Sequence, residues 1–538
     1  MPCAGGLLAS RPLLALPSFV SRSSQVVGIG FLTLGASLHN ILTRLKGHPQ
    51  SYPTINLVYS SSNPVYEPIL ICLPENGLRL RFDGPDQRLR LIEVLDFTKI
   101  SLSYENTDFP KLSKSDGVQQ AGPKFRHINR LFGVTYPGEY IPPLANGTHG
   151  TCILSYPGVA FSFSVSHSSW TTKRDSLSLM ASSAASPAQS MAVFLGDSWA
   201  AARSDLFTRQ PIYPRLTALA GKNKEYLADE IELVTVHGGG RIELVRKASA
   251  PFWITLSETT PQDLIAELGP PDAIYRKSDR RIRIHGGRPS NSSPSLGTSP
   301  SPRHGPIDPV DFDHTPDTSA IEDSDEDSSS SPERNPSSVA GECFYNYFNH
   351  GFDVFISQPT TSGPPFPGSS STKPLSVGNP PQLTATKLIL HGNIPGSYPF
   401  NRHRRSRWVL NINGDNSLNS ETPYSVISER LKKLWNGFYS NPSEEAAFQR
   451  GMVLNRGWGD SPGSSIELLG GWEESIGNRQ GDQPALGDAN ALGNTEIYGF
   501  PGSLFEVLKN ESITLAFKGG VDNWDSLERQ YPLLTWSD

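Results

Sequence analysis

Residues 77–94 hold the pattern that most restricts the fold of this chain, two strands joined by a tight turn. In the first strand, apolar residues alternate with Arg79 and Arg81, which gives one apolar and one charged face. Gly84-Pro85-Asp86 supplies the reversal of direction. The return strand changes phase at Ile92, which indicates either a β-bulge or a strand buried on both faces. A buried hairpin of this kind predicts an antiparallel sheet.

The segment before the hairpin predicts a short helix. Ser37 can cap this helix, four apolar residues at helical spacing form one stripe, and Gly47 ends it. Strands are then expected at residues 55–60, 69–73 and 100–104. The unit is therefore a helix followed by an antiparallel meander.

Similar helix-plus-strand patterns recur along the chain. Residues 260–271 have a capping Thr, Pro at the first helical position and a Gly stop, and they lead into a strand at 273–276. Residues 125–133 and 465–470 are shorter versions. Internal duplication and chance similarity of short amphipathic helices are both open interpretations. The predicted fold class is α+β, with repeated short helix plus antiparallel β-meander modules interrupted by disordered inserts.

Low-complexity inserts explain why only 36% of the residues are apolar, and they set the domain boundaries. Residues 286–340 are rich in Ser and Pro, contain an acidic run and lack apolar periodicity, so this linker is expected to be disordered. The predicted organisation is an unstructured extension at 1–25, a helix-plus-meander module at 26–170, a surface loop at 171–190, a second module at 191–285, the linker at 286–340, and a C-terminal module at 341–538 with loose inserts at about 358–382 and 477–493.

Charge and cysteine content exclude several classes of protein. The net charge of −6 and the pI of about 6.1 argue against a general nucleic-acid binder. The four cysteines are far apart and form no CxxC motif, so neither a zinc site nor a disulfide framework is indicated. No apolar run is long enough to span a bilayer. For residues 1–25, an unstructured extension or a wrongly chosen start is favoured over a transit peptide.

Two fragments imitate a serine hydrolase, which is the most distant alternative. His237-Gly238-Gly239-Gly240 resembles an oxyanion-hole motif, and Gly459-Asp460-Ser461-Pro462-Gly463 fits Gly-x-Ser-x-Gly. Pro462 has no N–H to donate to an oxyanion, and no histidine follows Ser461. The chain is therefore predicted to be no enzyme and to need no cofactor. Its histidines, His391 and His403 among them, lack the sequence spacing of known metal sites.

Two basic clusters are the candidate binding residues. The first, an anionic-lipid patch, comprises Arg402, His403, Arg404, Arg405, Arg407 and Trp408. The second comprises Arg276, Lys277, Arg280, Arg281 and Arg283. Either cluster can be a solvated strand face or an intramolecular partner of the acidic linker. The functional alternative is attraction to a phosphoinositide membrane surface: four arginines at about 1 kcal/mol each give roughly millimolar affinity, so a further partner would be needed.

Several motifs, in this order along the chain, resemble those of the phagosome assembly factor 1 family. They are Phe82-Asp83 with Gln87-Arg88-Leu89 and Ile92-Glu93-Val94, Phe132-Gly133-Val134-Thr135-Tyr136-Pro137-Gly138, Tyr156-Pro157-Gly158, Leu268-Gly269, Tyr345-Asn346-Tyr347-Phe348 with Gly351 and Asp353, Leu390-His391 with Asn393, and Tyr498-Gly499-Phe500. The resemblance is collinear from about residue 28 to about residue 520.

The resemblance implies a non-enzymatic adaptor of autophagy, cytoplasmic and peripheral at the phagophore assembly site. It further implies phosphoinositide recognition and a WD-repeat β-propeller partner. The alternative that it leaves open is a Golgi-to-plasma-membrane trafficking adaptor without direct lipid binding. It implies no lipid-binding residues, so the arginine patch is an inference from charge alone.

Overall fold

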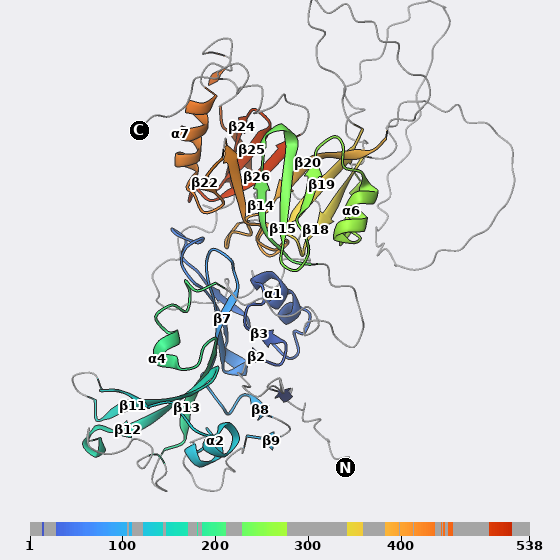
Figure 1. The fold of residues 1–538 in the computed structure, drawn as a ribbon. Coiled ribbons are helices and arrows are strands. Elements are labelled where there is room, and N and C mark those ends of the chain that lie inside the picture. Colours follow the sequence, from blue (N-terminus) through green and yellow to red (C-terminus); the bar gives the residue numbers. More distant parts are fainter. Residues whose placement is uncertain are drawn as a thin grey trace, which may run out of the picture. The chain divides into compact units, whose positions relative to one another are not determined.

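The structure is a computed structural model of the whole chain. It describes residues 13–15, 28–104, 107–109, 122–143, 147–170, 180, 186–210, 229–276, 342–358, 382–397, 399–412, 414–435, 443, 445–446, 450–455 and 494–518. Within these residues the fold is mostly antiparallel β-sheet with a few short helices (Figure 1). The coarse α+β prediction is therefore confirmed.

An N-terminal eight-stranded sheet is formed by two four-stranded meanders. Its strand order is β10-β11-β12-β13-β7-β6-β5-β4, so the two meanders meet through their last strands, β13 and β7. A helix precedes each meander along the chain. The elements are α1 (Leu38–Lys46), β4 (Asn56–Val58), β5 (Ile69–Leu73), β6 (Leu78–Phe82), β7 (Leu89–Val94), α2 (Phe125–Phe132), β10 (Glu139–Ile141), β11 (His149–Tyr156), β12 (Val159–Ser166) and β13 (Ala188–Phe194).

A C-terminal eight-stranded sheet has the same plan. Its order is β17-β18-β19-β20-β26-β25-β24-β23, so here too the last strands of two meanders, β20 and β26, pair antiparallel. Figure 1 shows α6 beside the β18–β20 end of this sheet and α7 beside its β24–β25 end. The elements are α6 (Pro261–Leu268), β17 (Ala273–Arg276), β18 (Cys343–Tyr347), β19 (Phe352–Ser357), β20 (Thr384–Leu390), α7 (Tyr424–Leu434), β23 (Met452–Asn455), β24 (Asn494–Phe500), β25 (Ser503–Val507) and β26 (Ile513–Lys518).

A five-stranded sheet combines strands that are far apart in sequence. Its order is β16-β15-β14-β21-β22, and β14 pairs parallel to β21, with Val234 opposite Trp408. These strands are β14 (Ile231–Val236), β15 (Arg241–Arg246), β16 (Phe252–Thr255), β21 (Trp408–Ile412) and β22 (Asp415–Asn419). The smaller elements are β1 (Leu13–Ala15), β2 (Gly28–Ile29), β3 (Leu32–Thr33), β8 (Ser101–Tyr104), β9 (Thr107–Asp108) and α4 (Trp199–Ala202).

The third strand of every four-stranded meander begins in the same way. It starts directly after a glycine with positive φ. Glycine adopts this backbone conformation readily, whereas residues with a Cβ avoid it, so the glycine lets the chain turn here. These glycines, with their φ values, are Gly77 (64°), Gly158 (80°), Gly351 (87°) and Gly502 (75°). Three residues after each glycine comes a fully buried apolar side chain, namely Leu80, Phe161, Val354 and Phe505. The inward positions of the four strands therefore build the two main cores.

The central hairpin and helices α1, α2 and α6 lie where the sequence pattern predicts them. Strands β6 and β7 pair across the 84–86 turn, and a bulge interrupts the ladder between Arg81 and Phe82, close to the predicted change of phase. Helix α1 is capped by Ser37 and buries its predicted apolar stripe. The predicted strands 69–73 and 273–276 have their predicted bounds. The origin of the four units from one repeated module stays a prediction, and the 465–470 version lies outside the described residues.

The predicted 191–285 module contributes strands to more than one sheet, and the domain boundaries themselves stay a prediction. Strands from the 191–285 segment belong to three different sheets. Strand β13, most of which falls within this segment, belongs to the N-terminal sheet. Strands β14–β16 belong to the five-stranded sheet, and β17 belongs to the C-terminal sheet. The predicted insert regions 286–340, 477–493 and most of 358–382 lie outside the described residues.

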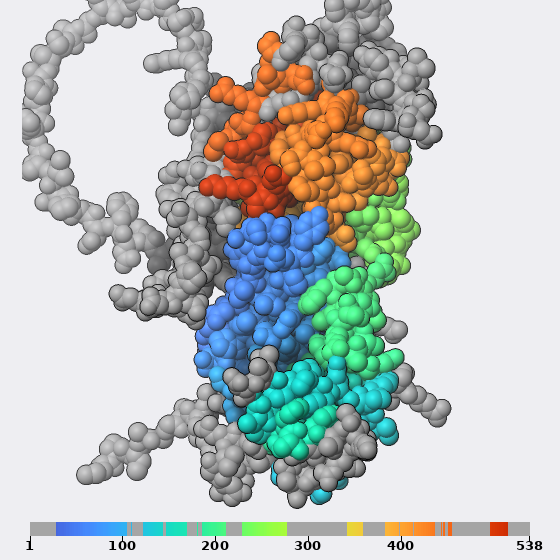
Figure 2. All heavy atoms as spheres, turned by 90° about the vertical axis from the view of Figure 1, so that its left-hand side faces the viewer, coloured from blue at the N-terminus to red at the C-terminus, as the bar shows by residue number. Residues whose placement is uncertain are grey.

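Residues of the first hundred positions also contact the C-terminal region directly. Tyr66 donates a hydrogen bond to the carbonyl of Glu421, and Val65 packs with Ile394 and Leu508. In the space-filling view, the N-terminal segment (blue) accordingly adjoins the orange and red segments (Figure 2). Of the helices that the structure describes, none combines the length and apolarity that crossing a membrane requires.

Candidate functional site

Asp353 is the centre of a buried polar cluster on the C-terminal sheet. It is the second residue of β19, so its side chain lies on the face opposite the core residues Phe352 and Val354. The turn before β19 contains Gly351, where an added Cβ would lie 2.4 Å from the carbonyl oxygen of Arg404. The backbone of the turn and that of the segment at Arg404 therefore approach each other closely.

Residues 391–407, which join β20 to β21, form the connecting segment and cover this face of β19. The segment is held by backbone hydrogen bonds at both of its ends. The N–H of His391 donates to the carbonyl of Gly351 at 2.9 Å, and the N–H of Arg404 donates to that of Phe348 at 2.8 Å. These bonds bring His391 and His403 to the same carboxylate, although they are separated along the chain.

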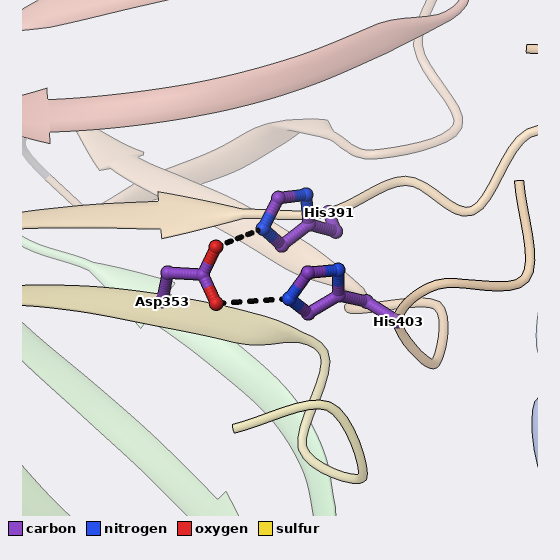
Figure 3. Close-up of side chains that lie close together, drawn as sticks. All are labelled: Asp353, His391 and His403. Carbon is purple, nitrogen blue, oxygen red and sulfur yellow. Dashed lines mark hydrogen bonds and ion pairs between the residues drawn. The ribbon is translucent and has the colours of Figure 1, made fainter. Parts of the chain in front are cut away.

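The two histidines bind opposite oxygens of the Asp353 carboxylate. His391 Nε2 lies 2.9 Å from Oδ2, and His403 Nε2 lies 2.8 Å from Oδ1 (Figure 3). The imidazole rings stack with their centroids 3.7 Å apart and their planes 15° apart. Asp353 and His403 are buried, at 8% and 3% exposure, whereas the side chain of His391 is 16% exposed.

Burial and hydrogen bonding shift the pKa values of two members of the cluster, Asp353 and His403. Burial alone would raise the pKa of Asp353, but the hydrogen bonds from His391 and His403 hold it well below its usual value. Burial lowers the pKa of His403 to about 4, although the hydrogen bond to Asp353 opposes this change. The carboxylate is therefore ionised and the His403 imidazole neutral, as metal coordination requires.

One ligand atom from each residue could contact a single ion, because the three atoms all lie within 4.8 Å of one another. Sequence reasoning missed this group because it considered spacing along the chain. The informative signal is the antiparallel sheet register: Asp353 pairs with Ile389, so His391, two residues further along its strand direction, lies diagonally across from Asp353 on the same face.

The predicted anionic-lipid patch is placed mostly inside the protein. Its members His403, Arg404, Arg405 and Trp408 are buried, Arg407 is half-buried, and Arg402 is exposed. The expectation of an exposed arginine cluster is therefore wrong for the four buried residues. Of the secondary basic patch, Arg276 is exposed at the end of β17, and the other four residues lie outside the described part of the chain.

Buried Arg405 and half-buried Arg407 bind the turn of the central hairpin. Arg405 donates to the carbonyls of Pro85 and Gly392, at 2.7 and 2.8 Å. Arg407 pairs with Asp86 at 2.7 Å and with Glu421 at 3.0 Å. These contacts connect the β6–β7 turn to the connecting segment. Their burial explains the arginines as structural donors, because a buried guanidinium needs several acceptors.

Nearby, two side-chain amides make the same connection. The Gln87 amide donates to the Asn393 carbonyl at 2.8 Å, and the Asn393 amide donates to Gln87 Oε1 at 2.7 Å. Asn393 Oδ1 in turn accepts from the N–H of Asn401 at 2.7 Å. The cluster around Asp353 and the contacts to the hairpin thus share one connecting segment.

The described part of the hydrolase-like motif, residues 237–240, forms a turn between two strands. Gly238–Gly240 form a 3-10 turn in the hairpin between β14 and β15, and His237 lies 3.5 Å from Glu243. The predicted nucleophile region around Ser461 lies outside the described residues.

Comparison with known proteins identifies relatives over most of the chain. The family model of phagosome assembly factor 1 (PHAF1) matches residues 28–299 and 325–516. A PHAF1 protein of Drosophila melanogaster is 22% identical over 502 residues, which cover 91% of this chain and 89% of the relative. A PHAF1 protein of Arabidopsis thaliana is 22% identical over 90% of both chains. One from Caenorhabditis elegans is 33% identical over 148 residues, 28% of this chain and 31% of the relative. No solved structure matches significantly.

Proposed function

Because this chain belongs to the phagosome assembly factor 1 family, we propose that it is a non-enzymatic factor of autophagy that acts at the phagophore assembly site. The observation that carries the proposal is the extent of the match, which includes both eight-stranded sheets. The two relatives that align over about nine-tenths of their length, from an insect and a plant, support a role for the whole chain.

In this proposal the protein is a peripheral adaptor that contacts a phosphoinositide membrane and a WD-repeat β-propeller partner. Among the described residues of the two predicted patches, Arg402 of the first and Arg276 of the second are exposed. An arginine near an anionic surface contributes only about 1 kcal/mol. In this proposal the protein partner therefore adds to the affinity that such charges supply.

The localisation test uses the full chain with a fluorescent tag in cells that lack the endogenous protein. On starvation, we expect the protein to move to puncta that contain an autophagosome marker, and we expect its loss to reduce the number of these puncta. Steady residence at the Golgi, without change on starvation, would overturn the proposal in favour of a Golgi trafficking adaptor.

The lipid test compares two charge reversals in vesicle flotation. Arg402→Glu should weaken binding of the full chain to phosphatidylcholine vesicles that contain phosphatidylinositol 3-phosphate. Arg130→Glu, an exposed arginine on α2, is the matched control and should leave binding unchanged. Equal loss in both variants would mean that net charge alone is responsible, and unchanged binding in both would remove Arg402 from the contact.

We also infer that the four helix-plus-meander units are copies of one module. The shared strand order of the two eight-stranded sheets and the four positive-φ glycines support this inference. Positions that all four units share then serve the fold. A polar group found in one unit alone needs another explanation.

A further inference from the structure

We propose that Asp353, His391 and His403 form a binding site for one zinc ion. This site goes beyond the proposed function, because it concerns how the chain is held together and requires neither membrane nor partner. The donor set is two imidazole nitrogens and one carboxylate oxygen, a combination that zinc accepts readily.

The geometry requires only a small adjustment. Around a tetrahedral zinc ion with bonds of about 2.0 Å, ligand atoms lie roughly 3.3 Å apart. The two imidazole Nε2 atoms now lie 2.9 and 2.8 Å from the Asp353 oxygens, and both face the carboxylate. An ion would replace the two N–H protons of these hydrogen bonds and bind one carboxylate oxygen together with the two Nε2 atoms, since one such set of three ligand atoms lies within 4.8 Å of one another.

The surroundings favour zinc over harder cations. Imidazole nitrogens suit zinc, copper, iron and nickel, whereas magnesium and calcium prefer oxygen ligands and several waters. Asp353 and His403 are buried, so a large hydration shell has no room on their side. The partly exposed His391 leaves access for a single water as fourth ligand. The same burial restricts access of a substrate, so we assign the ion a structural role.

The cluster is not required by the fold. In the other three meanders, the position equivalent to Asp353, two residues after the positive-φ glycine, is occupied by Arg79, Ala160 and Leu504. All four strands form with these different residues. Burying a carboxylate is costly unless it has partners, and among the described strands two histidines from another segment converge on the one at this position.

The position of the cluster indicates what the ion would do. His391 and His403 lie in the connecting segment, whose Asn393 and Arg405 bind Gln87 and Pro85 of the hairpin. An ion that joins both histidines to β19 would close this segment into a fixed loop. It would thereby hold the acceptors and donors of the hairpin contacts in place, in the same way that structural zinc sites stabilise small loops.

The first experiment measures metal content and affinity with the full-length chain, purified without a histidine tag and without chelator. We expect about one zinc per chain by inductively coupled plasma mass spectrometry. After removal of the metal, added zinc should restore binding with a single site and raise the melting temperature. Cobalt(II) in place of zinc should give the visible absorption of a tetrahedral nitrogen-and-oxygen site.

The variants test the ligands one by one. Asp353→Asn and His403→Gln should each weaken zinc binding by at least about 100-fold, since even the outer partners of zinc ligands typically account for about 10- to 100-fold. His350→Phe is the matched control: this buried histidine precedes the same strand, packs between Tyr347 and Phe352, and is no part of the cluster. Its zinc affinity should equal that of the unmodified chain.

The readouts separate loss of zinc from loss of the fold. Hydrogen exchange of the connecting segment in the unmodified chain should slow when zinc is added, and this comparison needs no variant. The proposal is overturned if the unmodified chain binds no zinc at micromolar concentration, if it purifies with iron instead, or if Asp353→Asn binds zinc as well as His350→Phe does. Failure here leaves the localisation test unaffected.

Discussion

The two eight-stranded sheets share a strand order but differ in the chemistry of their outer faces. In the N-terminal sheet, Arg79 on β6 pairs with Glu93 on the neighbouring β7, at 2.6 Å and partly exposed to water. At the equivalent position of the C-terminal sheet, Asp353 is buried and receives both hydrogen bonds from the connecting segment. The inward positions build the fold in both sheets, whereas the outward ones depend on what covers them.

The largest expected effect tests whether the inward positions are equivalent. Phe161 on β12 and Phe505 on β25 occupy the same place in their strands, and both are fully buried. Replacing either by alanine removes an aromatic side chain from a packed core and should cost about 4 kcal/mol of unfolding free energy. Urea unfolding followed by intrinsic fluorescence measures this loss. A loss below about 1 kcal/mol in one variant alone would break the equivalence of the two sheets.

The next effect concerns the buried charges of the connecting segment. Arg405→Met keeps the apolar stem of the side chain but removes the donors to Pro85 and Gly392 and the ion pair with Glu421 at 3.5 Å. Because Glu421, whose side chain is only 12% exposed, then keeps fewer partners, the variant should lose about 3 kcal/mol of unfolding free energy. The measurement is again urea unfolding. A double variant with Glu421→Gln should recover part of the loss, and no recovery would exclude the ion pair as its cause.

Element positions follow from local pattern, and the burial of charged residues does not. Alternation of Leu78 and Leu80 with arginines placed the central hairpin, and the capping of Ser37 placed α1, because both signals act between residues close in sequence. Arg405 was assigned to a candidate lipid-binding patch because it lies in a run of arginines. Its acceptors come from residue 85 and residue 421, and no local pattern contains such long-range contacts.

The same reason explains why the candidate site was not found from the sequence. Asp353 and His391 both lie in motifs that resemble the family, but the resemblance gives order along the chain and no register. Only the pairing of β19 with β20, and the return of the connecting segment over them, brings the third residue, His403, to the carboxylate. A helix with two histidines one turn apart would have shown the site directly.

Acid sensitivity gives a smaller effect and involves one buried histidine from each half of the chain. Burial lowers the pKa of His39 on α1 and of His350 before β19 to about 4 each. His39 faces Arg404, Asp272 and Lys46. His350 faces Arg404, Asp272 and Glu230.

In the unfolded chain, these histidines bind protons below the ordinary histidine pKa of about 6.5. In the folded chain, they bind protons only near pH 4. The unfolding free energy that the neutral, buried histidines contribute is therefore fully present above pH 6.5. It is lost as the pH falls toward 4. Each histidine should contribute about 2 kcal/mol of loss between pH 7 and pH 5. Urea unfolding of His350→Phe at both pH values should show a correspondingly smaller loss than the unmodified chain. An identical loss would mean that His350 is protonated in the folded state.

The smallest expected effect returns to the ion pair on the open face of the N-terminal sheet. Arg79→Met removes the 2.6 Å contact to Glu93, but Arg81 still lies 2.8 Å from the same carboxylate. Both arginine side chains are about one-third exposed, so water replaces most of the lost interaction. The variant should lose less than about 1 kcal/mol of unfolding free energy, and the loss should shrink in high salt. Arg405→Met makes the same chemical change inside the protein. The ratio of the two losses of unfolding free energy therefore measures how much more an arginine stabilises the fold when the connecting segment buries it. Equal losses would mean that burial between the hairpin turn and this segment does not distinguish the two arginines.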